Sequence, residues 1–298
     1  MDQAGNRALP GIAVVSHNSA ADLRRTLAGH ARAASTLGVP LAVVDNASTD
    51  GSVEFLDSFR ERAPRTILTL QPRNLGYAGA VNLAFSLLAG RDVLVLNPDV
   101  ELANEAPVLD LAAHLAKRPA VGVCAPRLLF ADGSVQPSAR RPASLAAMAG
   151  SLRLGSRVGA LRRSYQRYLS PSVEPGAGEV DWVIGAAMLI RRRAFEGVEG
   201  MDTGFFLYME DADFCRRLRR AGWEVSYVPR VTLRHDYARA SSAEGASALS
   251  SAARRRHFVS LARYWGKHPG ALFGRGARPG RRPQAEPTGE PQPGAGPG

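Results

Sequence analysis

Short apolar runs alternate with helical patterns through residues 10–125, and this alternation limits the possible folds more than any other feature of the chain. Amphipathic patterns between the runs predict helices over residues 22–34, 52–62, 78–88 and 105–117. Near-continuous apolar strands that alternate with such helices are typical of a mostly parallel sheet with helices on both faces. The sequence therefore predicts an α/β fold, with strands at 12–15, 41–44, 66–70, 93–96 and 121–124.

Polar residues follow four of these predicted strands. The carboxyl ends of parallel strands lie at one edge of a sheet, and ligands bind there. We therefore expect four polar loops to converge on one site. They are Ser16-His17-Asn18, Asp45-Asn46-Ala47-Ser48, Arg73-Asn74-Leu75-Gly76 and Asn97-Pro98-Asp99.

Composition limits the partners and the compartment. The 298 residues can form one large domain or two ordinary ones, and a formal charge of +11 predicts an anionic partner such as nucleic acid, anionic lipid or a phosphorylated substrate. Two cysteines, Cys124 and Cys215, exclude a disulfide framework and agree with a reducing cytosol.

The chain carries no pattern of a secreted or membrane-spanning protein. Its first residues are polar and do not resemble a signal peptide. No apolar stretch reaches the roughly 18–20 residues that a membrane-spanning helix needs, and the longest one, 182–190, predicts a buried strand. We expect a cytoplasmic protein whose membrane contact, if it has one, is peripheral and on the inner face of the plasma membrane.

The second half of the chain has a different texture. Residues 133–173 contain no acid and interleave arginines with leucines, which predicts a basic amphipathic helix or a mobile loop. This insertion is either a solvated face or a contact with anionic lipid or a pyrophosphate acceptor. We expect a main domain over 9–240 with the insertion at 133–178, a helical segment over 241–268 that includes a helix at 246–265, and a disordered tail over 269–298.

Three groups of residues can carry chemistry, and each has a plain structural alternative. Asp45 to Ser52 is either a turn with a helix cap or a contact with a nucleobase or ribose. The glycines Gly76 and Gly79 either complete a helix junction or allow a phosphate to approach the helix N-terminus. Trp182 is either a core residue or a face on which an acceptor sugar stacks.

The acidic residues point to a metal and a base. Asp99 offers a hard oxygen to Mg²⁺ or Mn²⁺, and His235, after a predicted strand, is a second ligand for the metal or a structural histidine. The cluster Glu210-Asp211-Ala212-Asp213 opens a predicted helix. Its three carboxylates repel one another, so one of them can have the raised pKa of a general base, while helix capping explains the others.

The order of these blocks resembles glycosyltransferase family 2, the inverting enzymes with the GT-A fold. The resemblance covers roughly residues 9–240, and within the family the chain looks most like rhamnosyltransferases that use dTDP-L-rhamnose in bacterial cell-surface polysaccharide assembly. The matching blocks are Val14 to Asn18, Val44 to Ser52, Asn74 to Asn82, Leu96 to Asp99, Gly185 to Arg191 and Phe205 to Phe214.

The resemblance implies roles for individual residues. Asp211 would be the catalytic base, and Asp99 and His235 would hold Mg²⁺ or Mn²⁺. Asn97 stands where many relatives carry the first Asp of the DxD metal motif, so the metal has fewer charged ligands here. Asp45 would hold the base of the nucleotide, and Asn74, Gly76 and Gly79 would line the nucleotide-sugar pocket. We expect the rest of the substrate site to include Ser16, Asn18, Asn97, Trp182 and Glu210.

The predicted activity is transfer of a sugar, best matched by L-rhamnose, from a dTDP or UDP donor. The acceptor would be a hydroxyl of a cell-surface polysaccharide or a polyprenyl-diphosphate-linked glycan. Two alternatives remain open on the sequence alone. A nucleotidyltransferase on a similar sheet would release pyrophosphate, and a basic nucleic-acid-binding protein would explain the charge. Against the latter, aromatic residues do not interleave with the basic stretch as a stacking platform requires.

Overall fold

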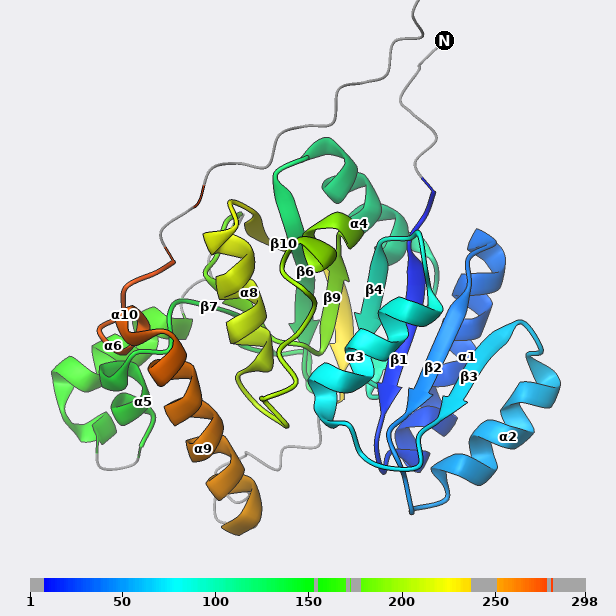
Figure 1. Cartoon of the computed structure of the whole chain (residues 1–298), viewed down its shortest axis with the longest axis horizontal. Coiled ribbons are helices and arrows are strands. Elements are labelled where there is room, and N and C mark those ends of the chain that lie inside the picture. The colour runs from blue at the N-terminus through cyan, green and yellow to red at the C-terminus, as the bar shows by residue number, and fades with distance from the viewer. Residues whose placement is uncertain are drawn as a thin grey trace, which may run out of the picture.

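The computed structural model describes residues 8–152, 155–169, 172, 178–236, 251–277 and 280, and it contains an eight-stranded sheet in the order β3-β2-β1-β4-β9-β6-β10-β5 (Figure 1). All five predicted strands are present. The strands of this sheet are β1 (Gly11–Ser16), β2 (Leu41–Asp45), β3 (Thr66–Leu70), β4 (Val93–Leu96), β5 (Val100–Glu101), β6 (Val121–Leu129), β9 (Ala187–Ile190) and β10 (Glu224–His235).

The sheet is mostly parallel, with one antiparallel strand inserted near its centre. Strands β3, β2, β1 and β4 are parallel, and β10 is parallel to β6. Strand β9 lies between β4 and β6 and is antiparallel to both, while β5 pairs antiparallel with the end of β10. The four parallel strands place the ends of β1, β2, β3 and β4 along one edge, as the sequence predicted.

Helices cover both faces of the sheet because buried side chains of the strands alternate between two cores. In β1, Ile12 and Val14 pack toward one core, and Ala13 and Val15 pack toward the other. The first core is closed by α1 (Ala20–Leu37), α2 (Ser52–Arg62) and α4 (Ala106–Lys117), and the second by α3 (Gly76–Leu87), α7 (Arg192–Gly197) and α8 (Glu210–Arg220). The predicted α/β class is therefore confirmed.

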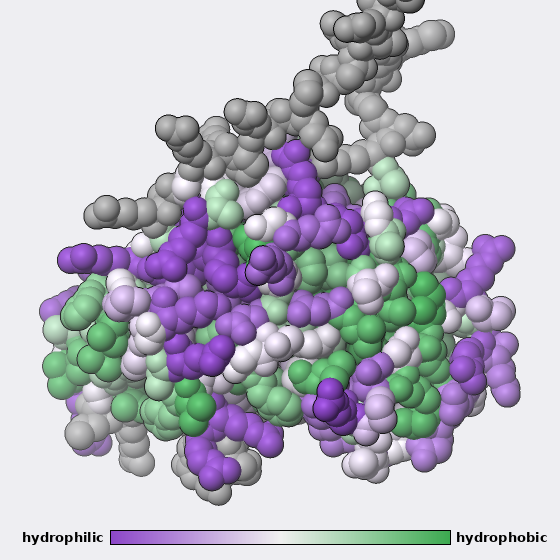
Figure 2. All heavy atoms as spheres, in the orientation of Figure 1, coloured by the Kyte–Doolittle hydropathy of each residue, from purple (hydrophilic) through white to green (hydrophobic). Residues whose placement is uncertain are grey.

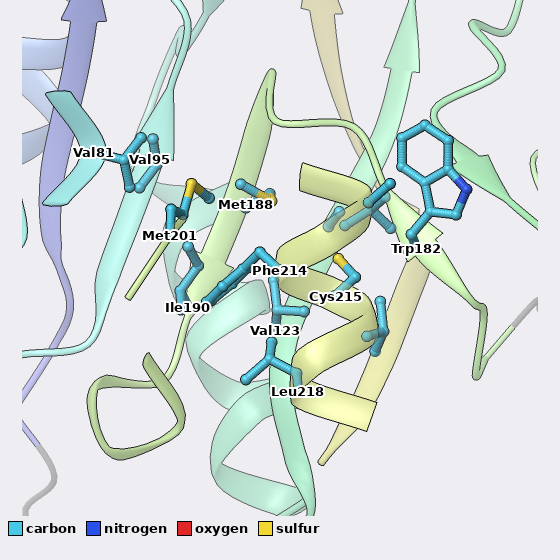
Figure 3. Packing of buried hydrophobic residues seen from close by; sticks show 14 of the residues in the cluster. Val81, Val95, Val123, Trp182, Met188, Ile190, Met201, Phe214, Cys215 and Leu218 are labelled. Atoms are coloured by element: carbon cyan, nitrogen blue, oxygen red, sulfur yellow. The ribbon is translucent and has the colours of Figure 1, made fainter. Parts of the chain in front are cut away.

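The helix α8 is anchored by its apolar side. Figure 3 shows Phe214 directed from α8 toward Ile190 of β9 and Leu218 beside Val123 of β6, and all four are buried in one core with Cys215 and Met188. This packing fixes the start of α8, which carries the acidic cluster, against the centre of the sheet.

The basic insertion forms small elements beside the main sheet. A second sheet pairs β7 (Ala139–Arg140) with β8 (Trp182–Val183), and the other elements are α5 (Leu145–Ser151), the 3₁₀ helix η1 (Gly155–Arg157) and α6 (Gly159–Leu169). The insertion is thus neither one long helix nor a single loop over its described residues. No helix among the described residues is long and apolar enough to cross a bilayer.

Two sequence predictions need correction. The apolar stretch 182–190 is not one strand, because β8 and β9 belong to different sheets and the chain changes direction at Gly185 between them. The tail predicted to be disordered from 269 contains structured residues, since α10 (Pro269–Leu272) follows α9 (Ser251–Lys267) and Ala271 and Ala277 are buried. The predicted helix at 246–265 is confirmed from residue 251 onward; residues 237–250 and 281–298 lie outside the described part.

The turn at Gly76 requires glycine for two separate reasons. Its φ is +73°, and a Cβ atom there would lie 2.6 Å from the carbonyl oxygen of Phe206. That same oxygen accepts a hydrogen bond from the Tyr77 amide at 3.1 Å. The start of α3 is therefore in direct backbone contact with the loop that leads into α8.

Replacing Gly76 by alanine should measure this contact. Gly90 is a matched control, because its φ is +76° and nothing lies within 4 Å of its Cβ position. We expect Gly90→Ala to lower the free energy of unfolding by about 1 kcal/mol from backbone strain alone. Gly76→Ala should cost about 1–3 kcal/mol more because of the steric clash. Urea unfolding of both variants checks this, and equal losses would show that the loop at Phe206 does not constrain the turn.

Candidate active site

The loops after β1 and β2 are joined by direct hydrogen bonds. The amide of Asn18 donates to Ser48 Oγ at 2.8 Å, and the amide of Thr49 donates to Asn18 Oδ1 at 2.8 Å. Asn18 has a φ of 50°, so its side chain and backbone turn toward the second loop. The predicted convergence of these two loops is present.

Asp45, at the end of β2, closes its own turn. Asp45 is fully buried. Its two carboxylate oxygens accept hydrogen bonds from the amide of Ser48 at 2.9 Å and from the Ser48 hydroxyl at 2.6 Å. Asp50 accepts from Ser52 in the same loop. The turn interpretation of this motif is thus realised. Contact with a nucleobase stays a prediction, and it is chemically allowed because a carboxylate can accept about four hydrogen bonds.

Ser16 lies beside Asp45 in the strand register. It is 1% exposed, and its hydroxyl oxygen makes no hydrogen bond with any described residue. A buried hydroxyl without a partner is uncommon, because the group loses its hydration without compensation. The end of β1 therefore presents a polar group that a ligand can satisfy.

Asn46 connects the second loop to the third. Its side-chain amide donates to Asn74 Oδ1 at 3.0 Å and to the carbonyl of Gly76 at 3.1 Å, and its Oδ1 accepts from the amide of Leu75 at 2.8 Å. Sequence reasoning gave Asn46 no individual role, because one asparagine in a polar turn carries no distinctive signal. The structure shows that it holds the glycine turn in place. A Cβ at Gly79 would lie 2.8 Å from Leu75 Cβ, so this turn is tightly packed.

Asp99 and His235 meet although they are far apart in the sequence. The Asp99 Oδ1 and His235 Nε2 atoms lie 3.1 Å apart, at the edge where β5 pairs with the end of β10. Gln136 Oε1 lies 2.6 Å from His235 Nδ1, and the tautomer with its proton on Nδ1 would direct the Nε2 lone pair toward a metal ion shared with Asp99. Gln136 was not singled out from the sequence, because a glutamine in a loop carries no local signal of its partner.

This pair fits two ligands of one divalent ion. Adjacent ligands of an octahedral ion, each about 2.1 Å from it, lie about 3.0 Å apart. Carboxylate oxygen and imidazole nitrogen suit Mg²⁺ and Mn²⁺, with the nitrogen favouring Mn²⁺. No group of three or more His, Cys, Asp or Glu side chains forms a metal site within the described residues. Such an ion would therefore depend on water or substrate oxygens for its other ligands.

The segment Gly185-Ala186 brings Asp211 close to the end of β4. The Gly185 amide donates to Asp211 Oδ2 at 2.9 Å, and the carbonyl of the next residue, Ala186, accepts from the amide of Asn97 at 2.8 Å. Consecutive residues of one segment thus hold Asp211 on one side and the Asn97-Pro98-Asp99 loop on the other. That these acidic motifs form one site stays a prediction.

Glu210 is buried and Asp211 is half-buried at the start of α8. Burial raises the pKa of Asp211, against the lowering effect of hydrogen bonds from the amides of Gly185 and Ala212 and of the Arg140 charge. Burial, followed by the charge of Asp211, raises the pKa of Glu210 well above its usual range. Glu210 Oε2 has no hydrogen-bond partner among the described residues. The pKa values of both neighbouring acids are therefore raised, as is typical of acids at catalytic sites.

Arg140 is the cation of this site, and sequence reasoning did not distinguish it from its neighbours in the basic insertion. Its Nε donates to the carbonyl of Pro137 at 2.9 Å, and its guanidinium donates to Tyr168 Oη at 3.1 Å. It also lies over the rings of Tyr168 and Trp182, at 5.5 Å and 5.0 Å from their centroids. These contacts hold a positive charge near Asp211.

Trp182 has a packing role in this arrangement. The residue is 4% exposed, its Nε1 donates to the carbonyl of Arg141 at 2.8 Å, and Arg140 lies over its ring. Of the two interpretations left open by the sequence, the core residue agrees with this burial. Stacking of an acceptor sugar on Trp182 would require Arg140 to move.

Asp213, the third acid of the cluster, is an ion-pair centre. It is fully buried and contacts Arg217 Nε at 2.7 Å, Lys267 Nζ at 2.8 Å and His268 Nε2 at 2.8 Å. Burial acts to raise its pKa, but the hydrogen bonds from His268, Lys267 and Arg217 outweigh it and lower the pKa of Asp213 to about 2. Asp213 therefore attaches the end of α9 to α8.

A cavity of about 560 Å³ lies away from these residues. It is bounded by α1, α2 and the amino-terminal ends of β2 and β3, with Gly38, Pro40, Leu41 and Thr66 among its lining residues. None of the acids described above lines it. Its position at the amino end of the strands separates it from the candidate active site.

The family model for "Glycosyl transferase family 2" matches residues 11–198, which include the ends of β1 to β4 and the segment at Gly185. The chain belongs to glycosyl transferase family 2. The N-acetylglucosaminyl-diphospho-decaprenol L-rhamnosyltransferase of Mycobacterium tuberculosis is 33% identical over 258 residues, which cover 80% of each chain. Rhamnosyltransferase WbbL of Escherichia coli is 50% identical over 50 residues, 17% of this chain and 19% of that protein. This member of the family is therefore rhamnosyltransferase-like.

Solved structures agree on the fold. The mannosyltransferase PcManGT from Pyrobaculum calidifontis, solved with GDP-Man and Mn²⁺, superposes with a TM-score of 0.58 at 18% identity, covering 90% of this chain and 66% of that one. GalNAc-T7, solved with UDP, GalNAc and Mn²⁺, gives 0.56 at 16% identity, covering 79% and 45%. The GT-A fold expected from the sequence is thereby confirmed.

The ion-pair centre at Asp213 predicts a pH-dependent stability. Its pKa is lower in the folded chain than the ordinary 3.8, so its stabilisation is present above about pH 4 and is lost as the pH falls toward about 2. Asp213→Asn should lower the free energy of unfolding near pH 7 by about 2 kcal/mol. The difference from the parent protein should shrink between about pH 5 and about pH 2.5.

Urea unfolding across this pH range is the measurement. Asp57→Asn is the control, because Asp57 is half exposed and its ion pair among the described residues is with Arg60 on the surface of α2. We expect the control to change stability by less than about 0.5 kcal/mol. A difference between Asp213→Asn and the parent that stays constant with pH would contradict the ionised state assigned to Asp213.

Proposed function

We propose that this glycosyltransferase transfers L-rhamnose from dTDP-L-rhamnose, with inversion, to a hydroxyl of a polyprenyl-diphosphate-linked glycan in cell-surface polysaccharide assembly. The observation that carries the proposal is the segment Gly185-Ala186, which holds Asp211 next to the loop of Asp99. The sugar and the lipid-linked acceptor follow the rhamnosyltransferase of Mycobacterium tuberculosis. The enzyme would then act at the cytoplasmic face of the membrane that carries its acceptor.

Asp211 is the proposed general base. It would take the proton from the acceptor hydroxyl as that oxygen attacks the anomeric carbon from the side opposite the diphosphate. Hydrogen bonds from the amides of Gly185 and Ala212 fix the carboxylate, and each oxygen keeps a lone pair to receive a proton. A base that is oriented before the reaction lowers the cost of positioning the hydroxyl.

The donor nucleotide would lie along the ends of β1, β2 and β3. The buried hydroxyl of Ser16 and the remaining lone pairs of Asp45 suit the base, and Asn18 lies at the rim beside them. Asn74 and the turn from Gly76 to Gly79 open a helix whose amino end favours phosphate. Asn97, at the end of β4, and Glu210 would complete the sugar pocket.

Asp99 and His235 are the residues that would hold Mg²⁺ or Mn²⁺. When bound, such an ion would neutralise the charge that develops on the departing diphosphate. His235 would supply a ring nitrogen, with Gln136 at its other nitrogen, and Asp99 would supply the negative charge. Asn97 contributes no charge where many relatives have Asp, which leaves Asp99 as the anionic ligand of this loop.

Family membership favours sugar transfer over the two alternatives left open by the sequence. A nucleotidyltransferase would release pyrophosphate from a nucleoside triphosphate, whereas this family transfers sugars. The basic charge, which suggested nucleic acid, is compatible with a nucleotide-sugar and a diphosphate acceptor.

Removal of the proposed base should abolish turnover without loss of donor binding. Asp211→Asn keeps the shape of the side chain but cannot take a proton, so we expect kcat to fall about 10²–10⁴-fold. Donor affinity should stay within about twofold, because a general base contributes little to ground-state binding. Release of dTDP from dTDP-L-rhamnose with a lipid-linked N-acetylglucosamine acceptor measures kcat. Asp110→Asn, on the exposed side of α4, is the control, and turnover of Asp211→Asn near the parent value would make the assignment wrong.

Donor binding should depend on the metal pair. Thermal shifts with dTDP-L-rhamnose, UDP-glucose and GDP-mannose, each with Mg²⁺, Mn²⁺ or EDTA, should show stabilisation by dTDP-L-rhamnose with metal. At a hundred times Kd the gain is about 2.7 kcal/mol. Asp99→Ala and His235→Ala should lose the metal-dependent part of the shift because each removes one ligand. Equal shifts with EDTA and with metal in the parent protein would refute the metal site, and a preference for another donor would refute the choice of dTDP-L-rhamnose.

A further inference from the structure

Helix α9 and the loop before α8 expose an unusual combination of side chains. We call it the aromatic–arginine patch and define it as Phe206, Arg255, Arg256, Phe258, Val259 and Arg263. Its apolar members are Phe206, which is 43% exposed, Phe258, which is 60% exposed, and Val259, which is 63% exposed. Large apolar side chains that cluster on a surface indicate an interaction site more often than single ones do. Over α9 and the neighbouring elements, Figure 2 shows hydrophobic and hydrophilic residues side by side.

The patch surrounds a small hollow with cations on its rim. A cavity of about 150 Å³ is lined by Phe206 and Val259 together with Arg255, Arg256 and Arg263. No carboxylate among the described residues pairs with Arg255 or Arg256. By contrast, Arg263 lies 3.4 Å from Asp202, and Lys267 also contacts this carboxylate. The guanidinium of Arg256 lies 5.2 Å from the centre of the Phe206 ring, which holds it at the hollow. Two arginines are thus available to an anion.

The patch is connected to the proposed base through a short series of contacts. On α9, Ser260 Oγ donates to the carbonyl of Leu207 at 2.8 Å, and the ring of His257 meets that of Tyr208 edge to face at 5.2 Å. Both partners belong to the loop that ends at Glu210 and Asp211. A ligand seated on the patch would therefore lie beside the entrance to α8.

A second route leads from the patch to the same acids. The Phe206 carbonyl accepts from the amide of Tyr77, and the Tyr77 hydroxyl donates to the carbonyl of Gly185. The amide of Gly185 in turn holds Asp211. Burial and then the Arg140 charge lower the pKa of His257, so Arg140, which acts on Asp211, also acts on α9. The patch and the base are parts of one structural unit.

We propose that the aromatic–arginine patch binds the diphosphate and first isoprene units of the polyprenyl-diphosphate acceptor; this inference rests on the proposed function. Arginine recognises phosphate with a planar fork of donors, and Arg255 and Arg256 offer two such groups. The apolar side chains of Phe206, Phe258 and Val259 match the hydrocarbon that follows the diphosphate. The glycan on the other side of the diphosphate would then extend toward Asp211.

The proposal commits to a lipid diphosphate rather than to the headgroups of a bilayer. A general membrane surface needs a broad face, whereas here the cations converge on one hollow that is in contact with the loop of the proposed base. Binding to anionic vesicles without binding to a lipid diphosphate is therefore an outcome that separates the two.

The test measures binding of farnesyl diphosphate to the full chain by calorimetry, with inorganic pyrophosphate and farnesol as the partial ligands. The charge variant is Arg255→Gln with Arg256→Gln, and the apolar variant is Phe258→Gln with Val259→Gln. Matched controls are Arg60→Gln with Arg62→Gln on α2 and Leu109→Gln on α4, all of which are exposed. Glutamine preserves helix propensity at every position.

We expect the charge variant to bind farnesyl diphosphate roughly tenfold or more weakly, the loss expected from two charge-assisted contacts. The apolar variant should lose the preference of the parent protein for farnesyl diphosphate over pyrophosphate. The controls should behave as the parent, and the affinity of every variant for dTDP-L-rhamnose should be unchanged, which also shows that each is folded.

Three results would overturn the proposal: no binding of farnesyl diphosphate by the parent protein, parent-like affinity in the charge variant, or binding of phosphatidylglycerol vesicles without binding of farnesyl diphosphate. Failure of the proposed function would look different. In that case the parent protein would neither bind nor turn over dTDP-L-rhamnose, whatever its affinity for farnesyl diphosphate.

Discussion

The insertion of β9 between β4 and β6 is the constraint on which the candidate site depends. Because β9 runs antiparallel to β4, its first residues lie at the carboxyl end of β4, where the parallel strands present their polar loops. The residues just before it, Gly185 and Ala186, then use one amide and one carbonyl to hold Asp211 and Asn97. A Cβ on Gly185 would lie 2.9 Å from the Tyr77 hydroxyl, so a larger residue there would displace the Tyr77 ring.

The acidic cluster at the start of α8 is stable because its members are separated into different environments. Asp213 points toward cations of α8 and α9 and keeps a low pKa. Asp211 is held by backbone amides with Arg140 nearby, whereas Glu210 is buried and has a raised pKa. Asp213 thus attaches α9 to α8, whereas Glu210 and Asp211 form a pair of acids with raised pKa values. The attachment at Asp213 also holds α9, and therefore the aromatic–arginine patch, beside that pair.

Much of this arrangement could be predicted from local patterns, and the failures have clear causes. The strands and helices through residue 125 follow from periodicity, since near-continuous apolar runs and amphipathic turns are local properties. The stretch 182–190 was predicted as one strand because periodicity cannot show that Gly185 packs against Tyr77 and turns the chain into a second sheet. Arg140 and Gln136 were not selected, because an arginine in a basic stretch and a glutamine in a loop carry no local signal of their partners.

The sequence by itself determined the fold class, the polar ends of the strands and the residue types that a glycosyltransferase of this family needs, because each depends on neighbours within a few positions. Only the tertiary structure decided which of those residues meet. The 3.1 Å approach of Asp99 to His235, the contacts of Lys267 and His268 with Asp213, and the contact of α9 with the loop before α8 all join segments tens of residues apart. Such contacts depend on how β9 and β10 enter the sheet, and strand order is a property of the whole packed core rather than of any local pattern.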